Sequence, residues 1–472
     1  MANKITSVNS SEIWQTNRFE PKLYVFQTAL KNAKTSYVFV RLGDKNIATN
    51  IKRGQSPKPE TYKNKQQGDY IFIRTADVKK YQINTEGAVY LDSTTFATQK
   101  SNRIQAGDIL ISVVGNYLGS TSVVPPNIEI GCFNDNSACI RIVNKNISPY
   151  YVSAFFNSTF GQRLIQSLAT RTGQKILSAG NVQKLTLPIV DDKESVKKYK
   201  DSAEQSVKSN LLISRSQQLF YFRIGVDFNA ITKENTFSIN KSDFADADLW
   251  TPTYSYPLYV NTLKAIQAKW QTVPIGEIAD LKKGDEVGSD TYIGYLEKRK
   301  TDVPFVRTSD IVNYEIDQYP DFYIPVEIYD EIGQGFQAGD VLFTKDGKIG
   351  MVGMVTEYDK AIISSGFAGL RLNKKAKDYN ITPEYLFLCL SIKEIGIYAS
   401  KRRTVVASTI PHLREERLKE IEIPVLDKNT IDEITELVKE AFRLKDEKKR
   451  LIAEVRDTMD RYFDPSNLPT PY

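Results

Sequence analysis

The feature that most constrains this chain is an internal duplication, in which five sequence blocks of the first half recur in the same order in the second half. The blocks that begin at residues 72, 104, 115, 147 and 187 recur at 305, 336, 347, 381 and 423. The offsets between matched residues stay between 231 and 236. Ordered blocks at nearly constant spacing are very unlikely by chance, so the 472 residues are predicted to contain two copies of one unit. A solenoid is excluded, because its repeats recur every ~20–50 residues.

Local patterns predict the same elements in both copies. Gly107-Asp108 and Gly339-Asp340 each precede an apolar run, which is typical of a turn that leads into a buried strand. Ser148-Pro149 and Thr382-Pro383 place a hydroxyl cap before a proline, which predicts the first turn of a helix. Glycine turns and short apolar runs make up much of the remainder. Each unit is therefore predicted to have a β-rich half and a helical C-terminal part.

A long helix is predicted after each unit, over residues 191–225 and 430–463, and the second contains no glycine or proline. Its predicted seam alternates steps of three and four residues, as in a coiled coil, and comprises Ile434, Leu437, Ala441, Leu444, Lys448, Leu451 and Val455. Two helices of similar length predict an antiparallel pair that separates the two units. The alternative is that each helix packs only on its own unit.

The predicted fold class is therefore α+β, with two tandem-duplicated domains separated by two long antiparallel coiled-coil-like helices. The predicted boundaries are 1–190 for the first duplicated domain, 191–225 for the first helix, 226–272 for a connecting segment, 273–425 for the second duplicated domain, and 426–472 for the second helix with the C-terminal tail.

Charge is distributed unevenly along the chain. The whole chain has 63 basic and 57 acidic residues, a net charge of +6. Residues 1–190 hold 23 basic and 11 acidic residues (23 − 11 = +12), whereas residues 273–425 hold 20 and 25 (20 − 25 = −5). A surplus of cations favours binding to nucleic-acid phosphates, because it releases condensed counterions. The alternative is a domain that is merely basic, and the acidic second unit weakens the case for nucleic acid there.

The chain is poor in residues for catalysis. One histidine, His412, and three cysteines without Cys-x-x-Cys spacing argue against zinc and against histidine-based catalysis, so no metal or cofactor is expected. Motifs for adenine methylation and for a nucleotide-driven motor are missing from the sequence. Glu447-Lys448-Lys449 fits the end of a nuclease motif but is interpreted as surface charge, and His412 as structural. The lack of a signal peptide and of a long apolar run predicts a cytoplasmic protein.

Basic and amide side chains near glycines are the predicted DNA contacts, because such side chains bind phosphates and base edges. Two pairs of segments are taken as equivalent between the repeats: an early glycine turn, and a later basic loop. The predicted contacts are Arg53, Gln55 and Lys58 with Lys282 and Lys283, and Arg171, Gln174 and Lys175 with Lys401, Arg402 and Arg403. Arg74 and Arg307 occur in both repeats, so they are predicted to hold a common turn by pairing with Asp77 and Asp310.

The duplicated motifs resemble the specificity subunit of type I restriction–modification systems. The resemblance covers about residues 20–463 and rests on the Gly-Asp strand entries, the proline helix starts, and the unit endings at Leu187-Pro188-Ile189 and Ile423-Pro424-Val425. It implies two target-recognition domains, each reading one half of a bipartite, asymmetric site in double-stranded DNA. It also implies that the helices set the distance between the halves and dock two methyltransferase subunits, which motor-nuclease subunits join.

The resemblance implies a non-catalytic subunit, with methylation and ATP-dependent cleavage performed by its partners. Two alternatives remain open from the sequence. One is an interaction scaffold or inactive relative without DNA binding, which the acidic second unit motivates. The other is the split-off recognition part of a restriction–methylation enzyme.

Overall fold

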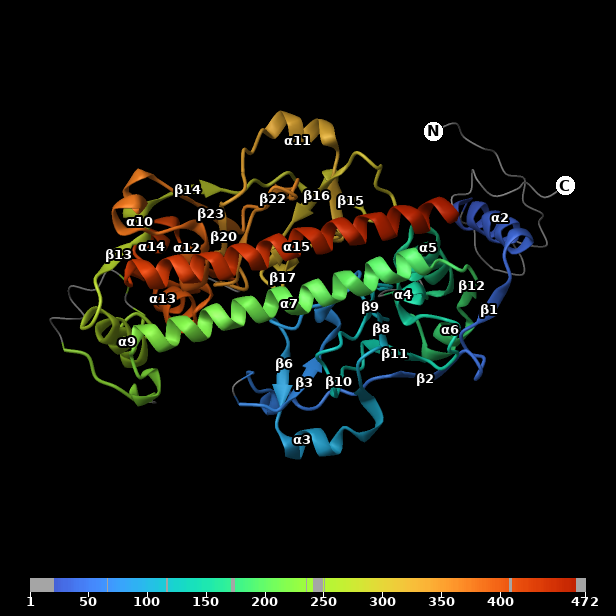
Figure 1. Ribbon diagram of the computed structural model, residues 1–472, viewed down its shortest axis with the longest axis horizontal. Helices are drawn as coiled ribbons and strands as arrows, with labels where there is room; N and C mark the ends of the chain where they lie inside the picture. Colours follow the sequence, from blue (N-terminus) through green and yellow to red (C-terminus); the bar gives the residue numbers. More distant parts are fainter. Residues whose placement is uncertain are drawn as a thin grey trace. The chain divides into compact units, whose positions relative to one another are not determined.

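The computed structural model describes residues 21–65, 67–115, 118–170, 175–234, 236–240, 249, 251–406 and 410–463 (Figure 1). The chain forms two compact units. Unit 1 contains the residues up to Glu204 together with those from Arg450 onward, and unit 2 contains Gln205–Lys449. This division passes through both long helices; the finer boundaries at 190, 225, 272 and 425 stay a prediction.

Unit 1 combines short strands with helices. Its elements are α2 (Pro21–Ser36), β1 (Phe39–Arg41), β2 (Ala48–Arg53), β3 (Tyr70–Ile73), β4 (Val78–Lys79), β5 (Gln82–Ile83), β6 (Val89–Leu91), α3 (Ser93–Thr98), β7 (Arg103–Ile104), β8 (Ile109–Ser112), β9 (Thr121–Val123), β10 (Gly131–Phe133), β11 (Ser137–Ile142), α4 (Pro149–Asn157), α5 (Thr159–Leu168), α6 (Ala179–Lys184), β12 (Thr186–Pro188) and the start of α7 (Lys193–Ile224).

Unit 2 repeats this plan. Its elements are α9 (Pro257–Gln267), β13 (Thr272–Pro274), α10 (Ile275–Ile278), β14 (Ala279–Lys283), β15 (Ile293–Gly294), β16 (Val303–Val306), β17 (Ile311–Val312), β18 (Glu315–Ile316), β19 (Phe322–Ile324), α11 (Val326–Ile332), β20 (Val341–Thr344), β21 (Val352–Met354), β22 (Ile362–Ile363), β23 (Phe367–Leu372), α12 (Pro383–Ser391), a π-helical turn (Lys393–Ile397), α13 (Tyr398–Arg403), β24 (Val405–Val406), β25 (Pro411–His412), α14 (Glu415–Lys419), β26 (Glu422–Pro424) and α15 (Lys428–Tyr462).

Strand order confirms the duplication. One sheet of unit 1 has the order β2-β11-β8-β9, and unit 2 has the matching order β14-β23-β20-β21. A second sheet, β6-β3-β10-β7, matches β15-β19-β16-β22 through its three shared strands, and β3–β10 and β16–β22 are both parallel. The pairs β1–β12 and β13–β26, and the hairpins β4–β5 and β17–β18, also match. The two sheets differ at their edges, where unit 1 adds β7 and unit 2 adds β15.

The predicted helix starts are confirmed in both units. The Ser148 hydroxyl accepts a hydrogen bond from the N–H of Tyr150 at 3.2 Å, and the Thr382 hydroxyl accepts one from Tyr385 at 3.1 Å. A proline follows each cap at the first helical position, where its missing N–H costs nothing. These caps therefore define the first turns of α4 and α12 in the same way.

The buried apolar residues form equivalent cores in the two units. Between the two sheets of unit 1 lie Ile73, Leu110 and Phe133, and between those of unit 2 lie Val306 and Leu342. A larger core in unit 2 joins the β14–β21 sheet, α12 and parts of both long helices. None of the described helices is long and apolar enough to cross a membrane.

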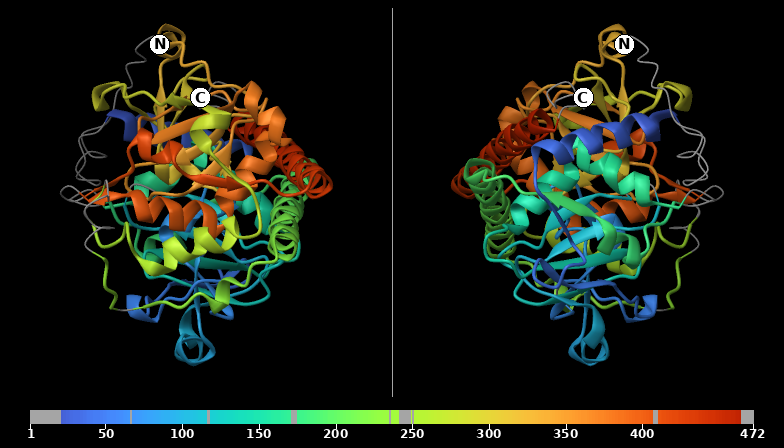
Figure 2. Two further views of the ribbon diagram at one scale, coloured as in Figure 1. Left: turned by 90° about the vertical axis from the view of Figure 1, so that its left-hand side faces the viewer. Right: turned by 90° about the vertical axis from the view of Figure 1, so that its right-hand side faces the viewer.

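The long helices α7 and α15 run antiparallel, as predicted. In unit 1, Lys198 of α7 pairs with Glu454 of α15 at 2.9 Å, and in unit 2, Asn210 of α7 accepts a hydrogen bond from Lys445 at 2.9 Å. The partner on α15 thus moves backward as α7 moves forward. In both views of Figure 2, α7 (green) and α15 (red) lie side by side.

Each long helix ends on the helical part of the opposite repeat. In unit 1, Asp460 of α15 accepts the N–H of Thr159 at 2.7 Å, at the start of α5. In unit 2, Tyr221 of α7 donates to Glu394 at 2.7 Å, in the π-helical turn after α12. The alternative in which each helix packs only on its own unit is therefore wrong.

The predicted seam of α15 is half correct. The row of Ile434, Ala441, Lys448 and Val455 is buried as predicted. The second buried row is shifted by one residue and comprises Val438, Lys445, Ile452 and Met459, whereas Leu437 is only half-buried. A helix that packs on a globular unit as well as on a partner helix buries a wider face than the strip of a two-helix coil, which explains the difference.

Candidate nucleic-acid interface

Segments that are distant in the sequence meet at one edge of unit 1, which we call reading edge 1: residues 53–58, 113–115, 134–136 and 175–177. Arg53, the last residue of β2, donates from Nε to the carbonyl oxygen of Asp135 at 2.7 Å. The N–H of Gly115 donates to the carbonyl oxygen of Lys175 at 3.2 Å. The side chains of Arg53 and Lys175 are exposed, so the fold places these two predicted DNA contacts on the same edge.

A glycine allows the close approach on which this edge depends. A Cβ on Gly54 would lie 2.2 Å from the carbonyl oxygen of Asn134 and 2.3 Å from that of Phe133, closer than any side chain permits. The chain therefore passes directly over the turn that follows β10. Gln55 and Lys58, the next predicted contacts, are exposed beyond this crossing.

Unit 2 has an equivalent edge, which we call reading edge 2: residues 283–286, 345–347, 364–366 and 411–413. Lys283 ends β14 and is exposed, and a Cβ on Gly284 would lie 2.0 Å from the carbonyl oxygen of Ser364. The N–H of Gly347 donates to the carbonyl oxygen of Pro411 at 3.0 Å, as Gly115 does in unit 1. The predicted match between the Arg53 turn and the Lys283 turn is thus supported by the backbone. Lys282 points to the carbonyl oxygen of Gly335, at 2.9 Å.

Reading edge 2 carries more negative charge than reading edge 1. His412 bonds through Nδ1 to the carboxylate of Asp346, and the ammonium of Lys345 lies 3.5 Å from the same carboxylate. Glu286 accepts hydrogen bonds from Ser365 at 2.8 Å and from Tyr292 at 2.9 Å. Carboxylates therefore neutralise part of the positive charge that a phosphate would meet here.

The second predicted pair of basic loops is not equivalent. The carbonyl bonded by Gly347 belongs to Pro411, so the counterpart of Lys175 is Pro411 and not the segment 401–404. Lys401, Arg402 and Arg403 instead form the last turn of α13. The sequence offset misled here, because the second repeat has a longer connection between that helix and the next strand. Arg171 and Gln174 lie outside the described residues.

The three basic residues of α13 have different surroundings. Lys401 is exposed. Arg402 donates to the carbonyl oxygen of Tyr254 at 2.8 Å and lies over its ring, and burial together with the neighbouring Arg403 lowers the pKa of Arg402. Arg403 is 7% exposed and donates to the side chain and carbonyl of Glu420 at 3.2 and 3.0 Å. These contacts favour a structural role for Arg403.

The paired turns predicted from the repeat are confirmed. Arg74 Nε lies 2.9 Å from Asp77 Oδ2, which also accepts the N–H of Arg74 at 3.1 Å. In unit 2, Arg307 makes the same two contacts with Asp310 at 3.5 and 3.0 Å. The two arginines hold a common turn, as expected of residues that both repeats retain.

A second conserved pair of contacts was missed from the sequence. Arg141 donates two hydrogen bonds of 2.6 Å to the carboxylate of Asp108, and Arg371 donates to Asp340 at 2.7 and 2.6 Å. The hydrogen bonds from Arg141 raise its pKa. A signal was present, because Ile140-Arg141-Ile142 recurs as Leu370-Arg371-Leu372 at an offset of 230.

The fold and the two edges define a class of protein: a duplicated α+β recognition protein with two equivalent but differently charged surfaces. A family model described as "Type I restriction modification DNA specificity domain" matches residues 267–456. The chain belongs to this family of DNA sequence-specificity proteins, which confirms the resemblance found in the sequence. No curated protein matches the chain.

Several solved structures are similar to this chain at low identity. The S subunit of a type I restriction–modification system from M. genitalium is 12% identical, with a TM-score of 0.29 over 92% of this chain and 97% of that one. The HsdS subunit from Thermoanaerobacter tengcongensis is 14% identical, with a TM-score of 0.28 over 90% and 96%. A chain from work on assembly and conformational transition of the type I R-M system is 15% identical, with a TM-score of 0.28 over 91% and 96%. No argument below depends on these likenesses.

Proposed function

We propose that this chain is a non-catalytic specificity subunit that reads a bipartite, asymmetric site in double-stranded DNA, one half per unit. It docks two methyltransferase subunits, and motor-nuclease subunits complete the restriction enzyme. Its place of action is the cytoplasm, where DNA and these partners meet. The observation that carries the proposal is the duplication of one topology with diverged side chains at equivalent edges.

The two reading edges support recognition of different half-sites. Arg53 and Lys283 occupy equivalent positions at the ends of β2 and β14, yet arginine offers a planar fork to a base edge or phosphate and lysine a point charge. Lys175 is replaced by Pro411, which has no side-chain donor. Equivalent frames with different donors are expected to read different bases.

The proposed contacts follow from exposure on these edges. Those on described, exposed or partly exposed side chains are Arg53, Gln55, Lys58, Lys175, Lys282, Lys283 and Lys401. Arg171 and Gln174 remain proposed from the sequence. Arg402 and Arg403 are proposed to support Lys401, since both bond to the protein itself.

The test is a selection experiment with the full-length chain and its methyltransferase partner. A library of duplexes with two randomised segments and variable spacing should enrich two different half-sites at one separation. Arg53→Ala should relax preference in one half-site only, and Lys283→Ala in the other. Lys193→Ala is the control, because this lysine is 89% exposed at the start of α7 and lies on neither edge. Enrichment of one half-site alone, or of a symmetric site, would contradict the proposal.

A second candidate, an interaction scaffold without DNA binding, is favoured by the carboxylates Asp346 and Glu286 at reading edge 2. A binding titration in increasing salt separates the two. Recognition predicts that the logarithm of the association constant falls with the logarithm of salt, by roughly 0.9 per phosphate contacted. A scaffold predicts no measurable affinity at any salt concentration.

A further inference from the structure

Three lysines lie buried near the middle of α15. Lys445, Lys448 and Lys449 are 1%, 5% and 1% exposed. The interpretation of Lys448-Lys449 as surface charge is therefore wrong. A charged side chain is almost never fully buried unless it is paired, so the cluster needs an explanation.

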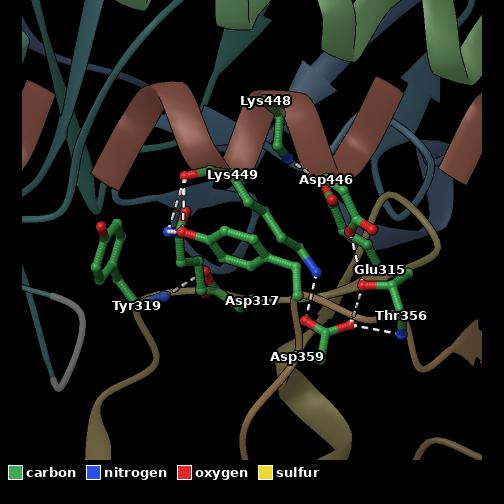
Figure 3. Close-up of polar contacts among 10 residues, drawn as sticks. Glu315, Asp317, Tyr319, Thr356, Asp359, Asp446, Lys448 and Lys449 are labelled. Carbon is green, nitrogen blue, oxygen red and sulfur yellow. Dashed lines mark hydrogen bonds and ion pairs between the residues drawn. The ribbon is translucent and has the colours of Figure 1, made fainter. Parts of the chain in front are cut away.

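Two of the lysines pair with carboxylates from loops of unit 2. Lys448 forms an ion pair with Glu315 of β18, and the Glu315 side chain is fully buried. Lys449 lies 2.5 Å from Asp359, in the loop before β22 (Figure 3). The carboxylates thus reach α15 from two separate segments.

The third lysine and the helix backbone add directional contacts. Lys445 donates at 2.8 Å to the carbonyl oxygen of Asn313, in the tight turn between β17 and β18, where φ is 51°. The carbonyl oxygen of Lys449 accepts hydrogen bonds from Gln318 at 2.9 Å and from Tyr358 at 3.3 Å. Thr356 donates to Asp446 at 2.6 Å. The same two loops are therefore bonded both to side chains and to the backbone of α15.

These loops lead directly to reading edge 2. Asp359 lies three residues before β22, and β22 ends at Ser364, whose carbonyl packs against Gly284. The N–H of Ser364 donates to Val306 at the end of β16, the strand that precedes the β17–β18 hairpin. The position of the loops on α15 is thus passed through short strands to the reading edge.

The cluster belongs to the second repeat only. The residues of α7 at the same offset as the three lysines are Asn210, Ile213 and Ser214, because the two helices begin 235 residues apart. The hairpin of unit 1 likewise has Gln82 where unit 2 has Glu315. Helix and hairpin therefore differ together between the repeats, as expected if the charges work as a set.

Buried ion pairs contribute little net stability but strongly disfavour arrangements that leave a charge unpaired. Polar residues within an apolar seam define one alignment for the same reason. The apolar rows of α15 repeat every seven residues, whereas the lysine cluster occurs once. It can therefore select one placement where apolar packing alone would accept several.

We propose that Lys445, Lys448 and Lys449, with Glu315 and Asp359, form a positioning device that holds the β17–β18 hairpin and the loop before β22 at one place along α15. The device thereby fixes reading edge 2 relative to the spacer helix and sharpens the choice of spacer length between half-sites. This second part rests on the proposed function.

The test replaces one ion pair by an apolar pair of similar size. Lys448→Met/Glu315→Met removes both charges at once and leaves no unpaired partner from this pair. The matched control is Arg443→Met/Glu440→Met, an exposed ion pair of 2.7 Å on the same helix. Circular dichroism of both variants establishes that they are folded.

Two measurements follow. In duplexes that carry the half-sites selected by the wild type with spacers changed one base pair at a time, the Lys448/Glu315 variant should keep its half-sites but lose about tenfold of its preference for one spacer. Hydrogen exchange of residues 311–316 and 356–363 should become about tenfold faster, and that of 428–442 should not change. The control should match the wild type in both.

The outcomes separate the two proposals. Unchanged hydrogen exchange in the folded variant would overturn the positioning role, and faster exchange with an unchanged spacer preference would overturn its part in spacer choice. A wild type that selects no bipartite site would contradict the proposed function, and hydrogen exchange would still decide whether the cluster positions the loops.

Discussion

The duplicated ion pairs Arg141–Asp108 and Arg371–Asp340 permit one prediction to be worked out in full. The Asp108 side chain is 2% exposed and accepts two hydrogen bonds of 2.6 Å from Arg141 and one of 3.0 Å from the N–H of Gln105. Arg141→Met keeps most of the aliphatic stem and removes both charged donors. The carboxylate then remains buried with one of its three hydrogen bonds.

The expected cost follows from this geometry. Removing one partner of a fully buried ion pair costs about 3–5 kcal/mol, because the remaining charge has lost its compensation. The Arg141 side chain is 34% exposed, however, so solvent screens the pair and water can reach the vacated side of the carboxylate. We therefore expect the free energy of unfolding of unit 1 to fall by about 2–3 kcal/mol.

The assay is hydrogen exchange of the β8 amides in increasing urea, which measures the unfolding free energy of unit 1 separately. Arg371→Met provides an internal replicate, since the Arg371 side chain is also 34% exposed and bonds Asp340 in the same way. It should destabilise β20 by a similar amount, and the two effects should add because they belong to different units. A loss below about 1 kcal/mol in either unit would refute the reasoning from buried charge.

Three further predictions concern pH, backbone packing and buried hydroxyls. Burial alone would raise the pKa of Glu315, but the buried lysines of α15 outweigh it and hold that pKa below 4.5, so unit 2 should lose stability as pH falls below about 4.5 in a urea-unfolding series, and less so in Glu315→Gln. Gly54→Ala and Gly284→Ala should each destabilise their own unit by about 1–3 kcal/mol, as measured by hydrogen exchange, because the new Cβ meets a carbonyl oxygen. Tyr151→Phe and Tyr385→Phe remove hydrogen bonds of 2.7 and 2.9 Å to the carbonyls of Pro188 and Pro424 and should each lower the thermal midpoint by the equivalent of about 1 kcal/mol; unequal losses would contradict their equivalence.

Local signals in the sequence were sufficient for much of the fold. The caps at Ser148 and Thr382 act on neighbouring N–H groups, so a few residues determine the helix start. The Arg74–Asp77 turn spans only three residues. The repeat turned such weak local signals into firm predictions, because each occurred twice in the same order.

Contacts between distant segments could not be predicted in this way. Lys448 has the same local sequence whether it faces solvent or Glu315, which lies 133 residues earlier. Polarity therefore suggested exposure where the fold supplied a partner. The offset between the repeats likewise could not show that Lys175 corresponds to Pro411, because the connection that precedes it has different lengths in the two units.

The two repeats together separate residues that hold the frame from residues that can read DNA. Arg74 and Arg307, like Gly54 and Gly284, are retained in both units and make equivalent contacts within the protein. Side chains at the same edges that differ between the units are free to vary, because equivalent backbone bonds hold the edge in place. A protein that must recognise two different half-sites with one architecture requires this division. Recognition should therefore change when the differing side chains are exchanged between units, and stability should change when the shared ones are replaced.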